Sequence, residues 1–268
     1  MLGAILGDIV GSAYENNNLK SKEFELFVEN STVTDDTIMT LAVAECIQNG
    51  YFNNKQKIVE IFKKWGRAYP NAGYGKLFAK WLFSKKTKPY GSFGNGAAMR
   101  ISSVGWYAKS EEEVKFLSKI FTEVTHNHPD ALKAAEVTAM CVYYARIGKS
   151  KDFIKAYVEK YYNIDFKYEE LLENFVFDEN CNNTIPQAIY CFLISTSFED
   201  CIRTTISIGG DCDTTSAISC AIAEAYYKEI DKTLLKKILK YLPLSNDVCN
   251  PDYIIQRFIK FKKELKEN

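Results

Sequence analysis

The stretch Ser207–Tyr227, SIGGDCDTTSAISCAIAEAYY, decides how this chain is expected to fold. Its second half is an apolar, alanine-rich helical pattern, and just before it Gly209 and Gly210 lead into two acids and two threonines. Aspartate and threonine at a helix start are common N-cap residues, because their oxygens accept hydrogen bonds from free backbone N–H groups. Capping needs only one such residue, whereas this stretch offers both Asp211 and Asp213. A metal site is therefore the alternative interpretation of the two acids.

Apolar residues at helical spacing dominate the rest of the sequence, whereas the sustained alternation typical of strands is absent. A capping box at Ser110–Glu113 predicts a helix start, and Pro186 is expected within the first turn of another helix. We therefore predict an all-α fold, a compact orthogonal multi-helix bundle with a central cleft, formed by residues 1–268 as a single domain. The helical stripes comprise Ile58, Ile61, Phe62 and Trp65, then Leu132, Ala135, Ala139 and Val142, and finally Ile254, Phe258, Phe261 and Leu265.

The composition narrows the class of protein. The chain has 268 residues, 47% of them hydrophobic, which is enough for one large core. Lys and Arg together number 34, as do Asp and Glu, so no overall basic charge favours stable nucleic-acid or membrane binding. The eight cysteines form no C-x-x-C pair and are interpreted as buried free thiols of a reducing compartment. Because the apolar N-terminal stretch resembles neither a signal peptide nor a membrane span, we expect a cytoplasmic protein. We also expect it to be a monomer.

A second acidic cluster, Thr34, Asp35 and Asp36, precedes another apolar helical pattern in VTDDTIMTLAVAE. Two clusters of this kind favour a metal site over two separate N-caps. Four carboxylates converging in one cleft would repel one another strongly unless cations lay between them. A ligand set made only of oxygen atoms suits Mg²⁺ or Mn²⁺ better than Zn²⁺. Cys212, between two aspartates, is expected to point away from the metal as a packing residue.

The stretch YGSFGNGAAMR, residues 90–100, is rich in glycine just before a further helical segment. Glycines allow a backbone to approach a ligand, and N–H groups at a helix entrance attract phosphate. Phe93 is a candidate for stacking on a base or ribose. The pattern matches neither a Walker loop nor the G-x-G-x-x-G fingerprint, so an ordinary turn stays open as an alternative. The chain's two histidines, His126 and His128, have no soft ligands grouped around them and do not predict zinc.

Taken together and in this order, these stretches resemble the ADP-ribosylglycohydrolase family over nearly the whole chain. The resemblance is carried by GAILGDIVGSAYE, TDDTIMT, GSFGNGAAMR, IPQAIYCFL and SIGGDCDTTSAI. The two acidic clusters at opposite ends of the sequence are its most specific part. The resemblance implies a compact all-α domain that holds two divalent ions, Mg²⁺ or Mn²⁺.

The resemblance also implies roles for particular residues. Glu15 falls where some branches carry a glutamate near the scissile bond, either as an acid/base group or as a resting-state metal ligand. Asp36 or Asp211 would accept a proton from the attacking water. The implied metal ligands are Thr34, Asp35, Asp36, Asp211, Asp213 and Thr214, and the implied substrate-binding residues are Asp35, Gly91, Ser92, Phe93, Gly94, Asn95, Gly96 and His126.

The activity implied is hydrolysis of the glycosidic bond between ADP-ribose and its acceptor, on an ADP-ribosylated protein or small molecule, with ADP-ribose as product. Two alternatives stay open: a two-metal phosphohydrolase acting on ADP-ribose-like nucleotides, and an ADP-ribose-binding module without turnover. The acceptor also stays open among arginine, serine, acetyl ester, nucleic-acid base and small molecule. Glu15 and IPQAIYCFL resemble the branch that acts on O-linked ADP-ribose.

Overall fold

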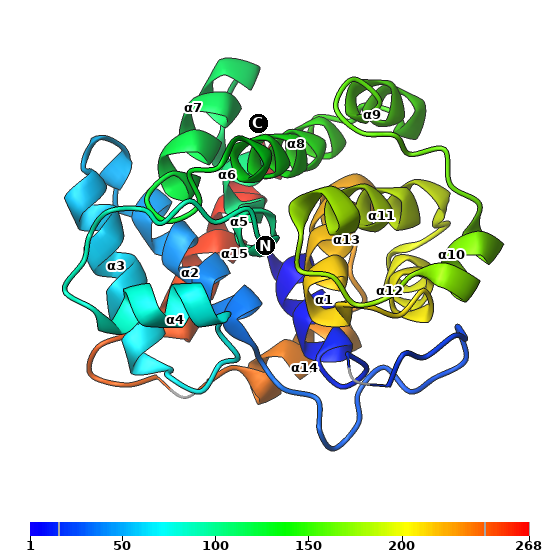
Figure 1. Cartoon of the computed structure of the whole chain (residues 1–268), viewed down its shortest axis with the longest axis horizontal. Helices are drawn as coiled ribbons and strands as arrows, with labels where there is room; N and C mark the ends of the chain where they lie inside the picture. The colour runs from blue at the N-terminus through cyan, green and yellow to red at the C-terminus, as the bar shows by residue number, and fades with distance from the viewer. Residues whose placement is uncertain (16, 244, 268) are drawn as a thin grey trace.

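Two helices from opposite ends of the sequence, α1 (Leu2–Gly11) and α13 (Cys212–Tyr227), lie side by side at the centre of the fold (Figure 1). Gly3, Gly7 and Gly11 form one stripe of α1 that faces α13. A Cβ atom added to Gly7 would lie 2.2 Å from the carbonyl oxygen of Ser216. The two backbones are therefore in direct contact, and no side chain fits between them at these positions.

The computed structural model describes residues 1–15, 17–243 and 245–267, and its regular elements over these ranges are helices. An isolated bridge between Gly94 and Asn180 is the single strand-like pairing there. The prediction of an all-α fold is confirmed. Besides α1 and α13, the helices are α2 (Asp35–Gln48), η1 (Tyr51–Asn53), α3 (Lys55–Ala68), α4 (Lys76–Phe83), α5 (Gly96–Met99), α6 (Ser102–Tyr107), α7 (Glu111–Thr122), α8 (Pro129–Arg146), α9 (Lys151–Val158), α10 (Tyr168–Asn174), α11 (Cys181–Ile194), α12 (Phe198–Ser207), α14 (Lys232–Tyr241) and α15 (Pro251–Glu267).

The other helices surround this central pair. Helices α2, α3 and α4 lie on one side of it, α11 and α12 lie on the other, and α8 crosses between the two groups (Figure 1). The predicted stripe of α3 faces the core, where Phe62 and Trp65 are fully buried. All eight cysteines are buried and free, as predicted. Within the described ranges, no helix has the length and apolar character needed to cross a membrane.

Two helix starts test the predictions made from local sequence patterns. At α7, the N–H of Glu113 donates to the Ser110 hydroxyl over 3.2 Å, so the predicted cap is confirmed. The position predicted for Pro186 is wrong, because α11 begins at Cys181 and Pro186 lies inside the helix. The Asn180 side chain caps this earlier start by accepting the N–H of Asn182 over 2.9 Å. Pro186 then offers no N–H to the carbonyl four residues before it.

We predict that Gly7→Ala destabilises the protein by about 1–3 kcal/mol, the usual cost of overpacking, because the new methyl group collides with the backbone of α13. Urea denaturation of the purified variant measures this loss. Gly75→Ala is the matched control, since a Cβ at Gly75 meets nothing within 4 Å, and it should change stability by no more than about 0.5 kcal/mol. Equal stability of the two variants would contradict backbone contact between α1 and α13.

Candidate metal centre

The N-terminus of α2 carries the first acidic cluster into the interior. Thr34 is the N-cap, and its hydroxyl accepts the backbone N–H of Asp36 over 3.3 Å. Asp36 is 2% exposed; its Oδ2 accepts a hydrogen bond from the Thr214 hydroxyl over 3.2 Å. Its Oδ1 has no partner among the described residues. A buried carboxylate oxygen left without a partner is costly, so this atom points to a group from outside the chain.

The N-terminus of α13 carries the second acidic cluster. Gly209 and Gly210 both have φ near 75°, a left-handed conformation that favours glycine. A Cβ atom on Gly210 would also lie 2.5 Å from the ring of Phe175. This turn brings Asp211 to the N-cap position, yet the Asp211 side chain caps no backbone N–H. It accepts the Asn95 amide over 2.6 Å instead, so capping alone does not account for Asp211.

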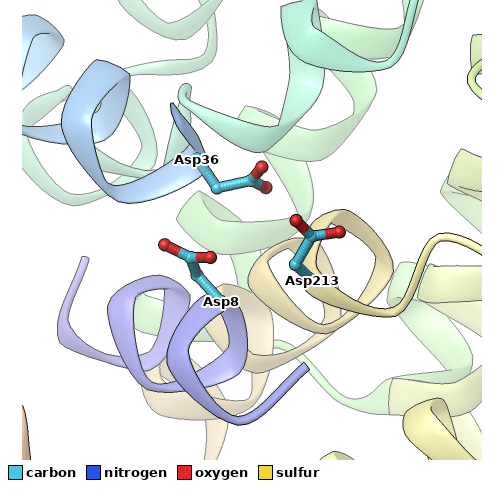
Figure 2. Close-up of side chains that lie close together, drawn as sticks. All are labelled: Asp8, Asp36 and Asp213. Atoms are coloured by element: carbon cyan, nitrogen blue, oxygen red, sulfur yellow. The ribbon is translucent and has the colours of Figure 1, made fainter. Parts of the chain in front are cut away.

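The two clusters meet at one place. Asp8, Asp36 and Asp213 come from three different helices and point toward one another (Figure 2). One carboxylate oxygen from each lies within 4.8 Å of the others, and Glu15, Asp211 and Asp213 form a second such group. Asp213 belongs to both groups. The structure therefore contains adjacent acidic clusters that could hold metal ions, joined through one shared aspartate.

Asp8 was missed by the sequence analysis. It is fully buried in α1 and accepts hydrogen bonds from two threonines near the start of α2. Thr34 donates its N–H over 3.0 Å and its hydroxyl over 2.7 Å, while Thr37 donates its N–H over 3.1 Å and also its hydroxyl. The local sequence signal for Asp8 is a single acid among the apolar residues and regularly spaced glycines of α1. These bonds connect α1 to the first acidic cluster.

Crowding changes the acidity of these carboxyl groups. Burial, together with the nearby charge of Asp213, raises the pKa of Asp35, Asp36 and Asp211 well above the usual carboxyl range. The same causes raise the pKa of Asp8 to about 7. So many carboxylates cannot all stay ionised in one small space without a compensating positive charge. A divalent cation is the group that would supply it.

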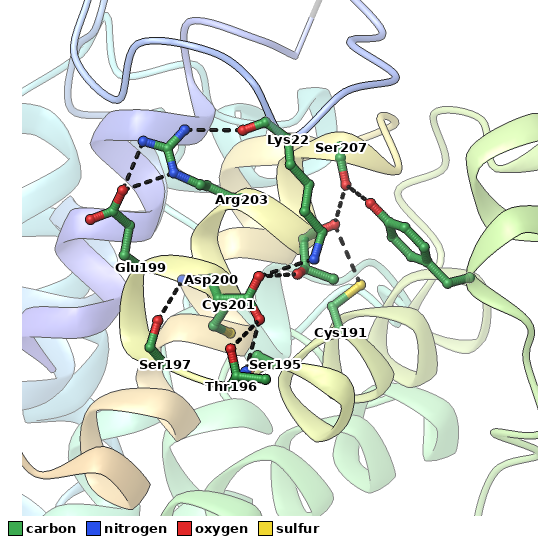
Figure 3. A network of polar contacts seen from close by, with 12 residues as sticks. Lys22, Cys191, Ser195, Thr196, Ser197, Glu199, Asp200, Cys201, Arg203 and Ser207 are labelled. Carbon is green, nitrogen blue, oxygen red and sulfur yellow. Dashed lines mark hydrogen bonds and ion pairs between the residues drawn. The ribbon is translucent and has the colours of Figure 1, made fainter.

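Glu15 lies half-buried in the turn after α1. Burial, and then the charges of Asp213 and Glu179, raise its pKa to about 7. The loop that follows is anchored to α12 by a polar network, in which Lys22 pairs with Asp200 at 3.0 Å (Figure 3). In the same network Arg203 donates to the carbonyl oxygen of Lys22 over 3.0 Å. These contacts anchor the loop to α12 at Lys22.

A cavity of about 530 Å³ opens onto the acidic centre. Ser92, near the start of the glycine-rich stretch, lines this cavity, whereas Gly91, Phe93 and Thr34 are not among its lining residues. Phe93 is 51% exposed and packs edge-on against His128, with ring centroids 5.6 Å apart. The predicted site residues that line the cavity are Glu15, Asp35, Asp36, Ser92, Gly94, Asn95, Gly96, His126, Asp211, Asp213 and Thr214.

The glycine-rich stretch is held in place by the segment before α11. The N–H of Asn95 donates to the carbonyl of Glu179 over 2.8 Å, and Cys181 donates to the carbonyl of Phe93 over 3.2 Å. Because the Asn95 amide also binds Asp211, this residue positions an acid of the centre. Its predicted contact with substrate stays a prediction. The thiol of Cys212 lies 3.9 Å from a carbonyl of α12, consistent with a packing role.

Some residues of the cavity were not predicted. They include Tyr74 and Phe78, around the start of α4, and Phe177 and Glu179, before α11. The sequence signal for the first pair was slight, a tyrosine between two glycines in AGYGKLF. A larger hollow of about 1020 Å³ lies between α14 and α15, and none of the predicted site residues lines it. The chemistry is therefore assigned to the smaller cavity.

The helical fold and the acidic cavity together define a protein with a candidate metal-dependent enzymatic site. Residues 1–258 match the sequence pattern of the ADP-ribosylglycohydrolases, so the chain belongs to the ADP-ribosylglycohydrolase family. The family predicted from the residues is thus confirmed, and with it the expected class of enzyme, a hydrolase of ADP-ribosyl linkages.

Individual relatives agree with this assignment. ADP-ribosylhydrolase ARH3 of Homo sapiens is 27% identical, and the match covers 85% of this chain and 84% of that protein. ADP-ribosyl-[dinitrogen reductase] glycohydrolase of Rhodospirillum rubrum is 26% identical over 73% of this chain and 69% of its own length. A solved structure titled ADP-ribosylglycohydrolase-related protein complex has a TM-score of 0.67 at 21% identity, covering 98% of this chain and 96% of that one. This last similarity shows the fold.

Proposed function

We propose that this chain releases ADP-ribose from an ADP-ribosylated protein or small molecule by hydrolysing the glycosidic bond, at a centre that holds two Mg²⁺ or Mn²⁺ ions. The observation that carries the proposal is that Asp36, Asp211 and Asp213 line one cavity of about 530 Å³, where Asp213 is shared by two carboxylate groups. The continuous core from Met1 to Phe258 supports a single domain.

The residues present fit divalent ions of this kind. The donors are carboxylates and threonine hydroxyls, hard oxygen ligands that suit Mg²⁺ or Mn²⁺. The unpartnered Oδ1 of Asp36 is an acceptor without a donor inside the described chain. The residues proposed to hold the ions are Thr34, Asp35, Asp36, Asp211, Asp213 and Thr214. When bound, such ions orient ribose hydroxyls and acidify an attacking water.

The chain's own residues would perform the proton transfers. Asp36 or Asp211 accepts the proton of the attacking water, and Asp211 is already oriented by the Asn95 amide. Glu15 lies at the cavity wall beside the second carboxylate group and donates a proton to the departing acceptor. The loop Gly91–Gly96 would follow the pyrophosphate and distal ribose.

The direct test is a panel of arginine-, serine- and nucleic-acid-linked ADP-ribose substrates, assayed with Mg²⁺ or Mn²⁺. We expect free ADP-ribose from at least one of them. Release of AMP instead would favour a phosphohydrolase, and binding of ADP-ribose without turnover on any substrate would favour a binding module. Either result would overturn the proposed reaction.

Metal removal should abolish activity on the best substrate. We predict that a chelator stops turnover and that Mg²⁺ or Mn²⁺ restores it, because the proposed ligands are all oxygen atoms. Initial rates before and after dialysis measure the effect, and elemental analysis identifies the ion. Full activity in chelator, or tightly held stoichiometric zinc, would contradict the proposed centre.

Asp8→Asn should weaken Mn²⁺ binding about 10–100-fold, as is common when a residue that orients metal ligands is changed. The asparagine replaces an acceptor of four hydrogen bonds with a group that presents N–H donors to Thr34 and Thr37. Calorimetric titration measures the affinity. Glu224→Gln is the control, because Glu224 is also fully buried but pairs with Lys262 at 2.6 Å. An equal effect of both changes would indicate a general loss of stability.

Glu15→Gln keeps the size of the side chain but removes the acid, so kcat should fall about 10²–10⁴-fold. Affinity for ADP-ribose should change little, since the glycine-rich loop and the ions are proposed to bind it. Phe93→Ala should show the opposite bias, with weaker ADP-ribose binding and a smaller effect on kcat, because its exposed ring belongs to the loop proposed to bind ADP-ribose but lies outside the acidic cavity. Steady-state kinetics and product binding separate the two. If Glu15→Gln leaves kcat unchanged, the acid role is wrong.

A further inference from the structure

Arg100 is a buried cation beneath the cavity. It follows α5 directly, is 1% exposed, and forms no ion pair with a carboxylate in the described ranges. Its guanidinium carbon lies 5.0 Å from the ring centroid of Phe62 and 6.0 Å from that of Phe78. Its Nε has no hydrogen-bond partner among the residues that the structure describes. Burying a cation without a counter-charge costs free energy. We therefore expect Arg100 to have a role that an apolar residue could not perform.

The hydrogen bonds that Arg100 does make determine the chemical state of a neighbour. Its Nη2 lies 2.6 Å from the Thr125 hydroxyl and 3.3 Å from Nδ1 of His126. A guanidinium group can only donate, so both atoms act as acceptors. The Thr125 hydroxyl, having accepted from Arg100, can give its own proton to Nδ1 over 2.8 Å. Both groups next to Nδ1 of His126 can donate hydrogen bonds to it. This nitrogen therefore acts as an acceptor and carries no proton.

The proton of neutral His126 must then lie on Nε2, which faces the cavity. A Cβ atom added to Gly96 would lie 3.4 Å from this Nε2, and both residues line the cavity. Burial, and then the charge of Arg100, lower the pKa of His126 well below its ordinary value. The ring of Tyr90 also faces His126, with centroids 5.9 Å apart, while the charge of Asp35 acts on Arg100 and Tyr90.

We propose that Arg100 is a positioning residue that fixes His126 as a neutral imidazole whose Nε2–H donates a hydrogen bond to an oxygen of the bound nucleotide. This rests on the proposed function, because it takes ADP-ribose as the ligand of the cavity. The buried charge of Arg100 adds a favourable field for an anionic ligand. A protonated His126 would instead direct its Nδ1–H at Arg100, and the other neutral tautomer would direct no donor into the cavity.

The tautomer can be measured directly, because the chain has only two histidines. Side-chain ¹⁵N NMR of the free protein should show His126 neutral with its proton on Nε2 from about pH 8 to about pH 5, the range in which histidine commonly titrates. His128, whose side chain is 41% exposed, gives the internal reference signal. A proton on Nδ1, or a cationic His126 near pH 7, would overturn the proposal without any substrate.

Variants separate Arg100 from its neighbour. Arg100→Met should allow the proton of neutral His126 to occupy either ring nitrogen. It should also weaken ADP-ribose binding about 10–100-fold, the usual effect of losing a hydrogen bond to a charged group. Arg100→Lys, which keeps the charge, should recover part of both. Thr125→Val should keep the Nε2–H tautomer because the Arg100 donor remains, and it tests the same prediction if the arginine variants do not fold. Loss of the tautomer in Thr125→Val would contradict the role of Arg100.

The binding and NMR results distinguish this inference from the proposed function. If the wild-type protein does not bind ADP-ribose, the proposed function and the contact of Nε2–H with substrate both fail. The NMR measurement still shows in that case whether Arg100 keeps the proton of His126 on Nε2. If ADP-ribose binds equally well to wild type and Arg100→Met, and the tautomer is unchanged, the inference fails and the proposed function stands.

Discussion

The backbones of α1 and α13 lie in direct contact, and the position of the acidic cavity follows from that contact. It joins the first and last parts of the chain and places Asp8 beside Asp213. Three glycines of α1 make this distance possible, because any side chain at those positions would collide with the α13 backbone. The same contact fixes the N-terminus of α13 next to that of α2. Without it, the two acidic clusters would have no common cavity.

This arrangement places several carboxylates close together in a buried site, where they repel one another strongly. Carboxylates gather around Asp213, and the nearest fully buried cationic side chain described at the cavity, Arg100, pairs with none of them. The repulsion is an unfavourable term in folding that bound cations would convert into a favourable one. Donors around the centre orient its acids: the Thr34 hydroxyl donates to Asp8, and the Asn95 amide donates to Asp211. Fold stability and metal binding are therefore expected to be coupled.

Helix content and the two acidic clusters could be predicted from sequence, because periodicity and N-cap residues are local signals. What depends on packing could not. The role of Asp8 depends on hydrogen bonds from donors 26 and 29 residues further along the chain, which the local sequence around Asp8 does not indicate. Pro186 was placed at a helix start because the cap supplied by Asn180 was not recognised. Arg100 followed a glycine-rich motif and gave no sign of its burial.

We propose that carboxylates from the starts of α2 and α13 hold two divalent cations around one shared aspartate, Asp213. The most direct measurement is anomalous X-ray diffraction from crystals of the wild-type protein grown with Mn²⁺. We expect two manganese peaks, one on each side of the Asp213 carboxylate, with oxygen ligands from the starts of α2 and α13. Crystals with no manganese at Asp213, or with ions bound only elsewhere, would contradict it.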